Sequence, residues 1–143
     1  MFTNLLIGGL LIASTVIFHA FALDFLIKRL KKVEILLLRT TQTFWKAIVL
    51  TVVILYVTLA LIVEIWVWAG FYICVDAITD LEESLYFSIS AFTTVGFGDV
   101  VLDKKWRILS AIEATNGFLL FGWSTAFIFE IVSKIYRQEG SKL

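Results

Sequence analysis

Three apolar runs constrain this chain more than any other feature of its sequence. They cover residues 5–27, about 47–73 and about 108–135. A helix needs about 20 apolar residues to cross the hydrocarbon core of a bilayer. The chain has 143 residues, 60% of them hydrophobic, and a mean hydropathy of +0.95. We therefore expect an all-α membrane protein with three transmembrane helices.

Composition narrows the class of function. The formal net charge is zero, which gives no indication of nucleic-acid binding. The sequence has no P-loop, no His-Glu-x-x-His zinc pattern and no Gly-x-Ser-x-Gly pattern, so we expect neither an enzyme nor an enzyme substrate or cofactor. The lone cysteine, Cys74, excludes an intrachain disulfide, and both a free thiol and an intersubunit disulfide stay open.

A shorter apolar segment, residues 81–92, lies between the second and third runs. It is too short to span a bilayer. Asp80 can cap a helix there, and Glu82 and Glu83 in the first turn suit the positive end of the helix dipole. We expect a short re-entrant helix that leads into non-helical backbone buried within protein.

Residues 93–99 read Thr-Thr-Val-Gly-Phe-Gly-Asp. Glycine at 96 and 98 allows backbone conformations that side-chain-bearing residues resist. Carbonyl oxygens from several copies of such a strand can replace the water oxygens around a dehydrated cation. Thr94 can add a ring of hydroxyl groups at the inner end.

This stretch resembles the potassium-channel selectivity filter, Thr-Val-Gly-(Tyr/Phe)-Gly-Asp. Residues 117–126, Gly-Phe-Leu-Leu-Phe-Gly-Trp-Ser-Thr-Ala, are similar to the inner-helix pattern Gly-x-x-x-Phe-Gly-x-x-Thr-Ala of simple bacterial potassium channels. The resemblance implies a small prokaryotic channel built on a pore module with two helices and a pore loop. One filter per chain then implies a fourfold symmetric homotetramer in a lipid bilayer, with K⁺ as its permeant ion.

The resemblance also divides the chain. Residues 1–30 are expected to form an extra N-terminal transmembrane helix, 31–46 a basic cytoplasmic linker, and 137–143 a cytoplasmic tail. The pore module covers 47–136, with an outer helix at 47–73, a pore helix at 81–92, the filter at 93–99 and an inner helix at 107–136.

Individual roles are carried over from the family by position. The residues expected to coordinate K⁺ are Thr94, Val95, Gly96 and Phe97. Filter support is expected from Thr93, Gly98, Asp99, Ser90 and Glu113. The inner-helix hinge and the cavity-facing stripe fall on Gly117, Phe118, Phe121, Thr125 and Phe129. Close helix packing is the alternative for the glycine, and for the phenylalanines it is lipid contact or core packing.

Ser90 departs from the family pattern. Several bacterial channels have a glutamate at this pore-helix position, paired with the aspartate after the filter. Ser90 cannot form that ion pair with Asp99. Glu113, one turn before Gly117, is a candidate substitute acceptor behind the filter.

Charge predicts the orientation. The loop after the first run contains one acidic residue, Glu34, among several basic ones, and Arg137 and Lys142 follow the third run. The basic residues of the loop are Lys28, Arg29, Lys31, Lys32, Arg39 and Lys46. The positive-inside rule then places the loop and the C-terminus in the cytoplasm, and the N-terminus and filter outside, in a multi-pass plasma-membrane protein.

His19 and Glu64 are ionisable residues that fall deep within the first and second apolar runs. Counted from the centres of their runs, His19 and Glu64 differ in depth by roughly 10 Å, which argues against a direct pair. A hydrogen bond to a neighbouring helix explains each one, and pH sensing by His19 is the functional alternative.

Taken together, the sequence predicts a potassium-selective channel that conducts passively. Two alternatives stay open, a weakly selective cation channel and a non-conducting accessory subunit. The gating stimulus has no recognisable sensor in the sequence.

Overall fold

Helices make up most of the part of the chain that the structure describes. The structure is a computed structural model that describes residues 2–37 and 44–140. The helices in these ranges are α1 (Phe2–Leu37), α2 (Phe44–Cys74), α3 (Leu81–Phe92) and α4 (Arg107–Gly140), and these ranges contain no strand. Three of the helices, α1, α2 and α4, are long and apolar enough to cross a membrane. The expectation of an all-α membrane protein with three spans is confirmed.

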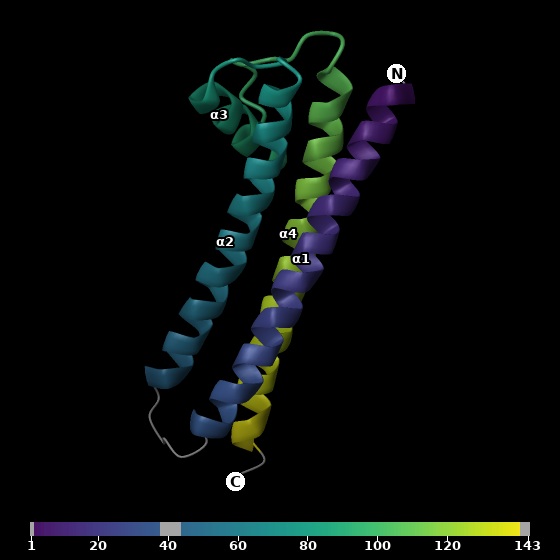
Figure 1. The fold of residues 1–143 in the computed structure, drawn as a ribbon. Coiled ribbons are helices and arrows are strands. Elements are labelled where there is room, and N and C mark those ends of the chain that lie inside the picture. Colours follow the sequence, from purple (N-terminus) through teal and green to yellow (C-terminus); the bar gives the residue numbers. More distant parts are fainter. Residues whose placement is uncertain (1, 38–43, 141–143) are drawn as a thin grey trace.

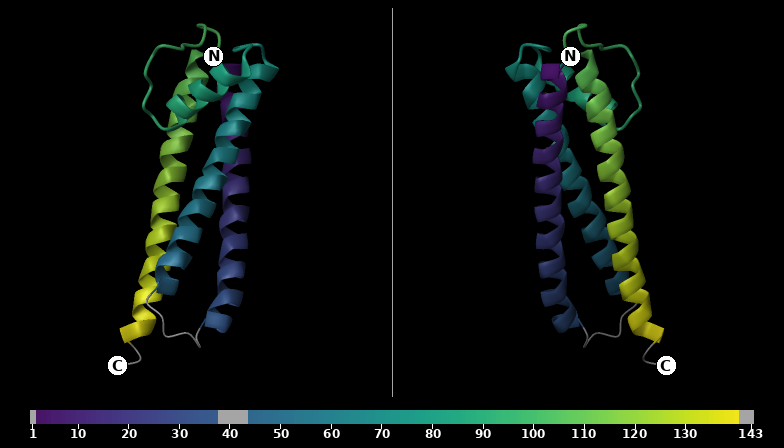
Figure 2. Two further views of the ribbon diagram at one scale, coloured as in Figure 1. Left: turned by 90° about the vertical axis from the view of Figure 1, so that its left-hand side faces the viewer. Right: turned by 90° about the vertical axis from the view of Figure 1, so that its right-hand side faces the viewer.

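The three long helices run side by side, and the short α3 lies at one end (Figure 1). α1 and α4 run in the same direction and α2 runs against them. α3 packs against both α2 and α4. The core at this end includes the fully buried Trp68, Tyr72 and Phe92. The segment after α3 loops out beside α4 before it enters that helix (Figure 2).

Three helices extend beyond their expected bounds. α1 continues to Leu37 and α2 begins at Phe44, so Lys31, Lys32 and Lys46 are helical although the sequence assigns them to a linker. No proline or glycine interrupts residues 28–37, so nothing in the sequence stops the helix at residue 30. α4 likewise runs to Gly140 and includes Arg137, while Arg39 and Lys142 lie outside the described residues.

α1 docks on the other helices through buried polar contacts. Nδ1 of His19 lies 2.8 Å from Oε1 of Glu64, and both side chains are fully buried. One turn earlier on the same face of α1, Nδ2 of Asn116 donates to Oγ1 of Thr15 at 2.8 Å. The prediction that His19 and Glu64 do not pair is therefore wrong. The depth count took 5–27 as the whole first span, whereas α1 continues to Leu37, so its midpoint lies closer to His19 than expected.

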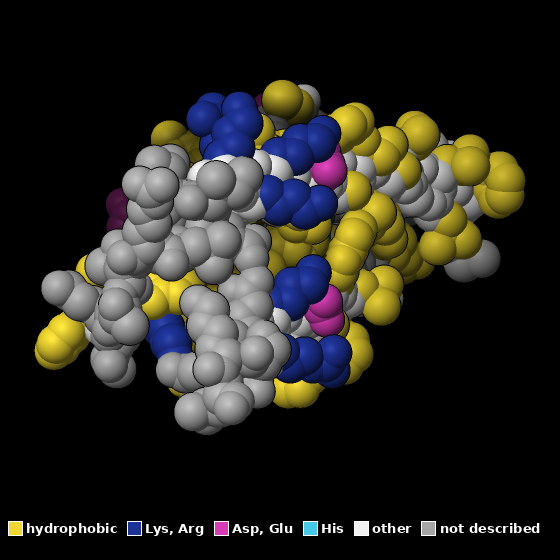
Figure 3. All heavy atoms as spheres, turned by 90° about the horizontal axis from the view of Figure 1, so that it is seen from below, with side chains coloured by type: hydrophobic (Ala, Val, Ile, Leu, Met, Phe, Trp, Pro, Cys, Tyr) yellow, Lys and Arg dark blue, Asp and Glu magenta, His cyan; other side chains and the backbone are white. Residues whose placement is uncertain are grey.

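The end away from α3 is strongly basic. Figure 3 shows Lys and Arg side chains gathered there, with a few acidic ones among them. Two of these side chains are paired four residues along their own helices, Lys28 with Asp24 and Lys134 with Glu130. Exposed cations at this end also include Arg29, Lys31, Lys32 and Arg137.

Candidate functional site

The short helix α3 aims the chain into residues 93–99. Asp80 has an extended backbone, and its carboxylate accepts the backbone N–H of Glu83 at 2.9 Å, which confirms the expected N-cap. At the other end the hydroxyl of Thr93 donates to the carbonyl of Ile89 at 2.7 Å. The helix thus has fixed ends, and its C-terminus continues directly into the glycine-bearing segment 93–99, which we call the strand although it belongs to no β-sheet.

The sign of the backbone angle φ alternates along that strand. Thr94, Gly96 and Gly98 have positive φ, at 62°, 55° and 80°, whereas Val95 and Phe97 between them do not. Glycine takes this conformation freely, but a β-branched threonine rarely does. Alternation of left- and right-handed residues turns successive peptide groups the same way, which is the geometry that a row of carbonyl ligands needs.

Ser90 holds the strand against α3 at two adjacent points. Its carbonyl accepts the backbone N–H of Gly96 at 3.1 Å, and its hydroxyl accepts that of Phe97 at 3.3 Å. A residue singled out because it lacks a charge therefore supports the strand through neutral hydrogen bonds instead.

Asp99 is held by Tyr86, which lies on α3 one helical turn before Ser90. The hydroxyl of Tyr86 donates to Oδ2 of Asp99 at 2.7 Å. The Tyr86 ring also stacks on that of Phe97, with centroids 6.4 Å apart and planes 11° apart. The hydrogen bond from Tyr86 lowers the pKa of Asp99 below its usual value, so the carboxylate stays charged at the end of the strand.

Glu113 is an acceptor, but its partner belongs to α2. Tyr72 donates to Oε2 of Glu113 at 2.7 Å, and both side chains are fully buried. The hydroxyl of Ser88, on α3, also faces this carboxylate, but the two groups do not meet the geometry of a hydrogen bond. Glu113 therefore joins α4 to α2 behind the short helix and forms no hydrogen bond with residues 93–99.

Gly117 lies against the C-terminal end of α3. A Cβ on Gly117 would sit 1.9 Å from the carbonyl oxygen of Phe92, well inside van der Waals contact. α4 continues as a helix through this position. Close packing, one of the two interpretations of Gly117, thus describes its surroundings. A Cβ on Gly122 would meet nothing within 4 Å.

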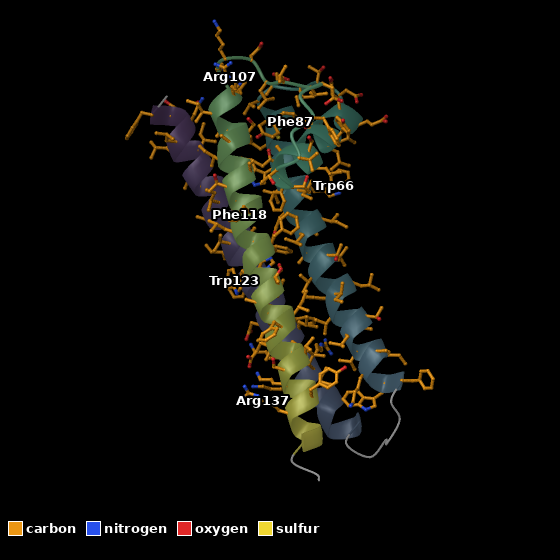
Figure 4. All side chains as sticks on the ribbon, turned by 180° about the vertical axis from the view of Figure 1, so that it is seen from behind. Trp66, Phe87, Arg107, Phe118, Trp123 and Arg137 are labelled. Atoms are coloured by element: carbon orange, nitrogen blue, oxygen red, sulfur yellow. The ribbon has the colours of Figure 1, made fainter. Side chains whose placement is uncertain are left out.

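The remaining inner-helix residues differ in exposure. Phe118 and Phe129 are each 71% exposed, and Thr125 is exposed as well. Phe121 is half-buried, and its ring meets that of Phe92 edge-on at 5.7 Å. Figure 4 shows Phe118 on α4 between Arg107 and Arg137, in the half of the helix nearer Arg107. An exposed stripe therefore runs along α4, with Phe121 at its edge turned toward α3.

One face of the strand is uncovered by its own chain. Val95 is 55% exposed and Phe97 is 70% exposed. A hollow of about 310 Å³ separates the strand from the N-terminal part of α4. Its lining includes Ser90, Gly96, Ser110, Ala111 and Ala114. The strand is therefore supported along α3 and open on its other sides.

Sequence reasoning did not identify several residues that shape this site. Tyr72, Tyr86 and Phe92 lie within the predicted apolar segments, and the sequence pattern gives none of them a role. Tyr86 is four residues before Ser90, so the helical repeat puts both on one face of α3, and this signal could have indicated it. No local signal indicates that Tyr72 meets Glu113.

Comparison with known families gives one match. A family model described as an ion channel matches residues 48–134, more than half of the chain. The matched range covers most of α2, all of α3 and most of α4, and leaves out α1. No curated protein and no solved structure matches the chain.

Proposed function

Because the chain belongs to this ion-channel family, we propose that it forms a potassium-selective pore through which K⁺ passes down its electrochemical gradient. The ligands are the backbone oxygens of Thr94, Val95, Gly96 and Phe97, with the Thr94 hydroxyl at the inner end. The observation that carries the proposal is the positive φ at every second residue of the strand. That pattern suits a row of carbonyls directed at one axis.

The pore is proposed to be a homotetramer. One chain supplies one strand, and a single strand cannot surround an ion. The exposed Val95 and Phe97 and the hollow beside the strand give neighbouring copies surfaces to cover. Cyclic symmetry then repeats the strand around one axis. The exposed stripe of Phe118, Thr125 and Phe129 would face the cavity below it, with Gly117 as a hinge.

The orientation follows from charge. The exposed cations of the basic end would face the cytoplasm, and the filter and N-terminus would face outward across the plasma membrane. Conduction of this kind needs no catalysis and no cofactor besides the permeant K⁺ ions.

A weakly selective cation channel is the second candidate. Asp99 is held by a neutral tyrosine hydroxyl, and the bond from Phe97 to Ser90 is long, at 3.3 Å. The bond from Phe97 to Ser90 joins two uncharged groups, and such a bond restrains a strand less than a charge-assisted bond does. A filter whose backbone can move would admit cations of other sizes.

Flux into proteoliposomes tests the proposal. We expect purified protein to carry K⁺ into vesicles much faster than Na⁺, and Gly98→Ala, at φ 80°, to abolish the K⁺ flux. The matched control is Gly9→Ala, where an added Cβ meets nothing within 4 Å. Equal K⁺ and Na⁺ flux indicates the weakly selective channel. No flux from tetrameric protein, across pH and voltage, indicates an accessory subunit.

A further inference from the structure

The contact between α1 and the other helices contains buried polar groups that the conduction path does not use. His19 and Glu64 are fully buried, and Ser124 is 4% exposed. Nδ1 of His19 lies 2.8 Å from Oε1 of Glu64, and Nε2 lies 3.2 Å from Oγ of Ser124. The ring of Trp123 covers the imidazole at 5.3 Å between centroids. The imidazole thus joins three helices, α1, α2 and α4.

No other charged group of the described residues shares this contact. α1 packs against α2 and α4, so these three helices supply every group that faces the imidazole. Their nearest other titratable side chains are Asp24 on α1, Tyr56 and Tyr72 on α2, and Glu113 and Glu130 on α4. Measured along each helix from Glu64 or Ser124, the shortest separation on α2 and α4 is that of Glu130, which is six residues, or about 9 Å, from Ser124. Asp24 is exposed and paired with Lys28.

Isolation of the pair fixes its net charge. A single buried charge with no counter-charge is costly in a low-dielectric interior. One proton shared between Nδ1 of His19 and Oε1 of Glu64 makes the pair neutral overall, whether it is an ion pair or two uncharged groups. Ser124 can serve either form, because its hydroxyl both donates and accepts.

We propose that His19, Glu64 and Ser124 form an intramembrane proton-binding site that locks α1 onto α2 and α4. The site goes beyond ion conduction and does not depend on which ion the filter selects. Its ligand is a single proton.

Separation of α1 from α2 and α4 changes the number of protons that His19 and Glu64 bind. In water, a histidine and a glutamate together hold that proton only below about pH 6.5, the ordinary pKa of histidine. Above that pH, any rearrangement that hydrates the pair releases one proton to solvent. The equilibrium constant for separation or unfolding then rises tenfold for each pH unit.

Reversible unfolding of the full-length protein in detergent micelles tests the site. Glu64→Gln keeps the shape and the hydrogen-bonding capacity of the side chain but cannot share the proton. From pH 7 to pH 9, we expect the unfolding constant of the wild-type protein to rise about 100-fold relative to that of Glu64→Gln. Thr15→Val is the control, because it removes a buried, non-titratable contact between α1 and α4, and its ratio to wild type should not change with pH.

A wild-type to Glu64→Gln ratio that stays constant between pH 7 and 9 overturns the proposal. If Glu64→Gln does not fold, His19→Gln gives the answer. It leaves a buried glutamic acid that holds its own proton, so release on unfolding begins near pH 4.3 instead of 6.5. Between those two pH values we then expect the unfolding constant of His19→Gln to rise about 100-fold relative to that of wild type. A ratio of the two unfolding constants that stays constant over this range overturns the proposal equally.

Discussion

The hydroxyl of Tyr86 donates a 2.7 Å hydrogen bond to Oδ2 of Asp99, which ties the short helix α3 to the residue that ends the glycine-bearing strand. The same ring stacks on Phe97. Tyr86 therefore holds the outer part of the strand through one polar contact and one aromatic contact.

Tyr86→Phe separates these two contacts, because it removes the hydroxyl and keeps the ring. The hydrogen bond lowers the pKa of Asp99 below its usual 3.8. Because the pKa of Asp99 is lowered in the folded state, the ionised carboxylate stabilises the fold at pH values above its usual pKa. That contribution is lost as the pH falls through the lowered pKa. We expect wild-type K⁺ flux to persist to a more acidic pH than the flux of Tyr86→Phe, measured in proteoliposomes from pH 5 to pH 3. Tyr136→Phe, on the distant end of α4, is the control. Coincident acid profiles for wild type and Tyr86→Phe would contradict the role of this bond.

Ser90→Ala removes the hydroxyl that accepts the backbone N–H of Phe97. The loss of one such bond, about 1 kcal/mol, loosens the strand, so we expect a lower K⁺/Na⁺ permeability ratio, by up to about tenfold. Bi-ionic current measurements give this ratio. Ser88→Ala, two residues earlier and therefore on roughly the opposite side of the same helix, should leave it unchanged. An unaltered ratio in Ser90→Ala would show that the strand does not depend on this hydroxyl.

Tyr72→Phe removes the only hydrogen-bond donor that reaches the buried Glu113 carboxylate with ordinary geometry among the described residues. A buried acceptor without its donor costs about 1–3 kcal/mol. We expect the free energy of unfolding in detergent to fall by that amount, with the ring still packed on Phe87. Tyr136→Phe, whose ring is 56% exposed, should change it by much less. Equal stabilities of the two variants would be inconsistent with a structural role for Glu113.

Gly117→Ala places a Cβ 1.9 Å from the carbonyl oxygen of Phe92, so the backbone of α3 or α4 must move. Overpacking of this kind costs about 1–3 kcal/mol or more. We expect a lower thermal stability and a loss of flux, because Phe92 leads directly into the filter. Gly9→Ala, on α1, should be neutral or slightly stabilising, since alanine favours helix over glycine. Wild-type stability of Gly117→Ala would refute the close approach.

Local chemistry made much of this architecture predictable. The apolar runs indicated three spans, Asp80 indicated the start of α3, and the glycines at 96 and 98 indicated the positions where φ is positive. Each of these depends on residues close together in sequence. The positive φ of Thr94 has no such signal, because its residue type argues against it.

Contacts between helices were not predictable in the same way. The pair of His19 and Glu64 depends on how α1 and α2 slide and tilt against each other, and residues 45 apart in sequence do not reveal that register. The contact of Tyr72 with Glu113 is of the same kind, at a separation of 41 residues. Periodicity tells which face of a helix is apolar, but it does not tell which turn of one helix meets which turn of the next.

The most direct measurement is the reversal potential of the purified protein in a planar bilayer with K⁺ on one side and Na⁺ on the other. A potassium-selective filter predicts a potential of the sign for K⁺, about 59 mV for each tenfold in permeability ratio, that collapses in Gly96→Ala, where φ is 55°. A robust current that reverses near zero would contradict potassium selectivity.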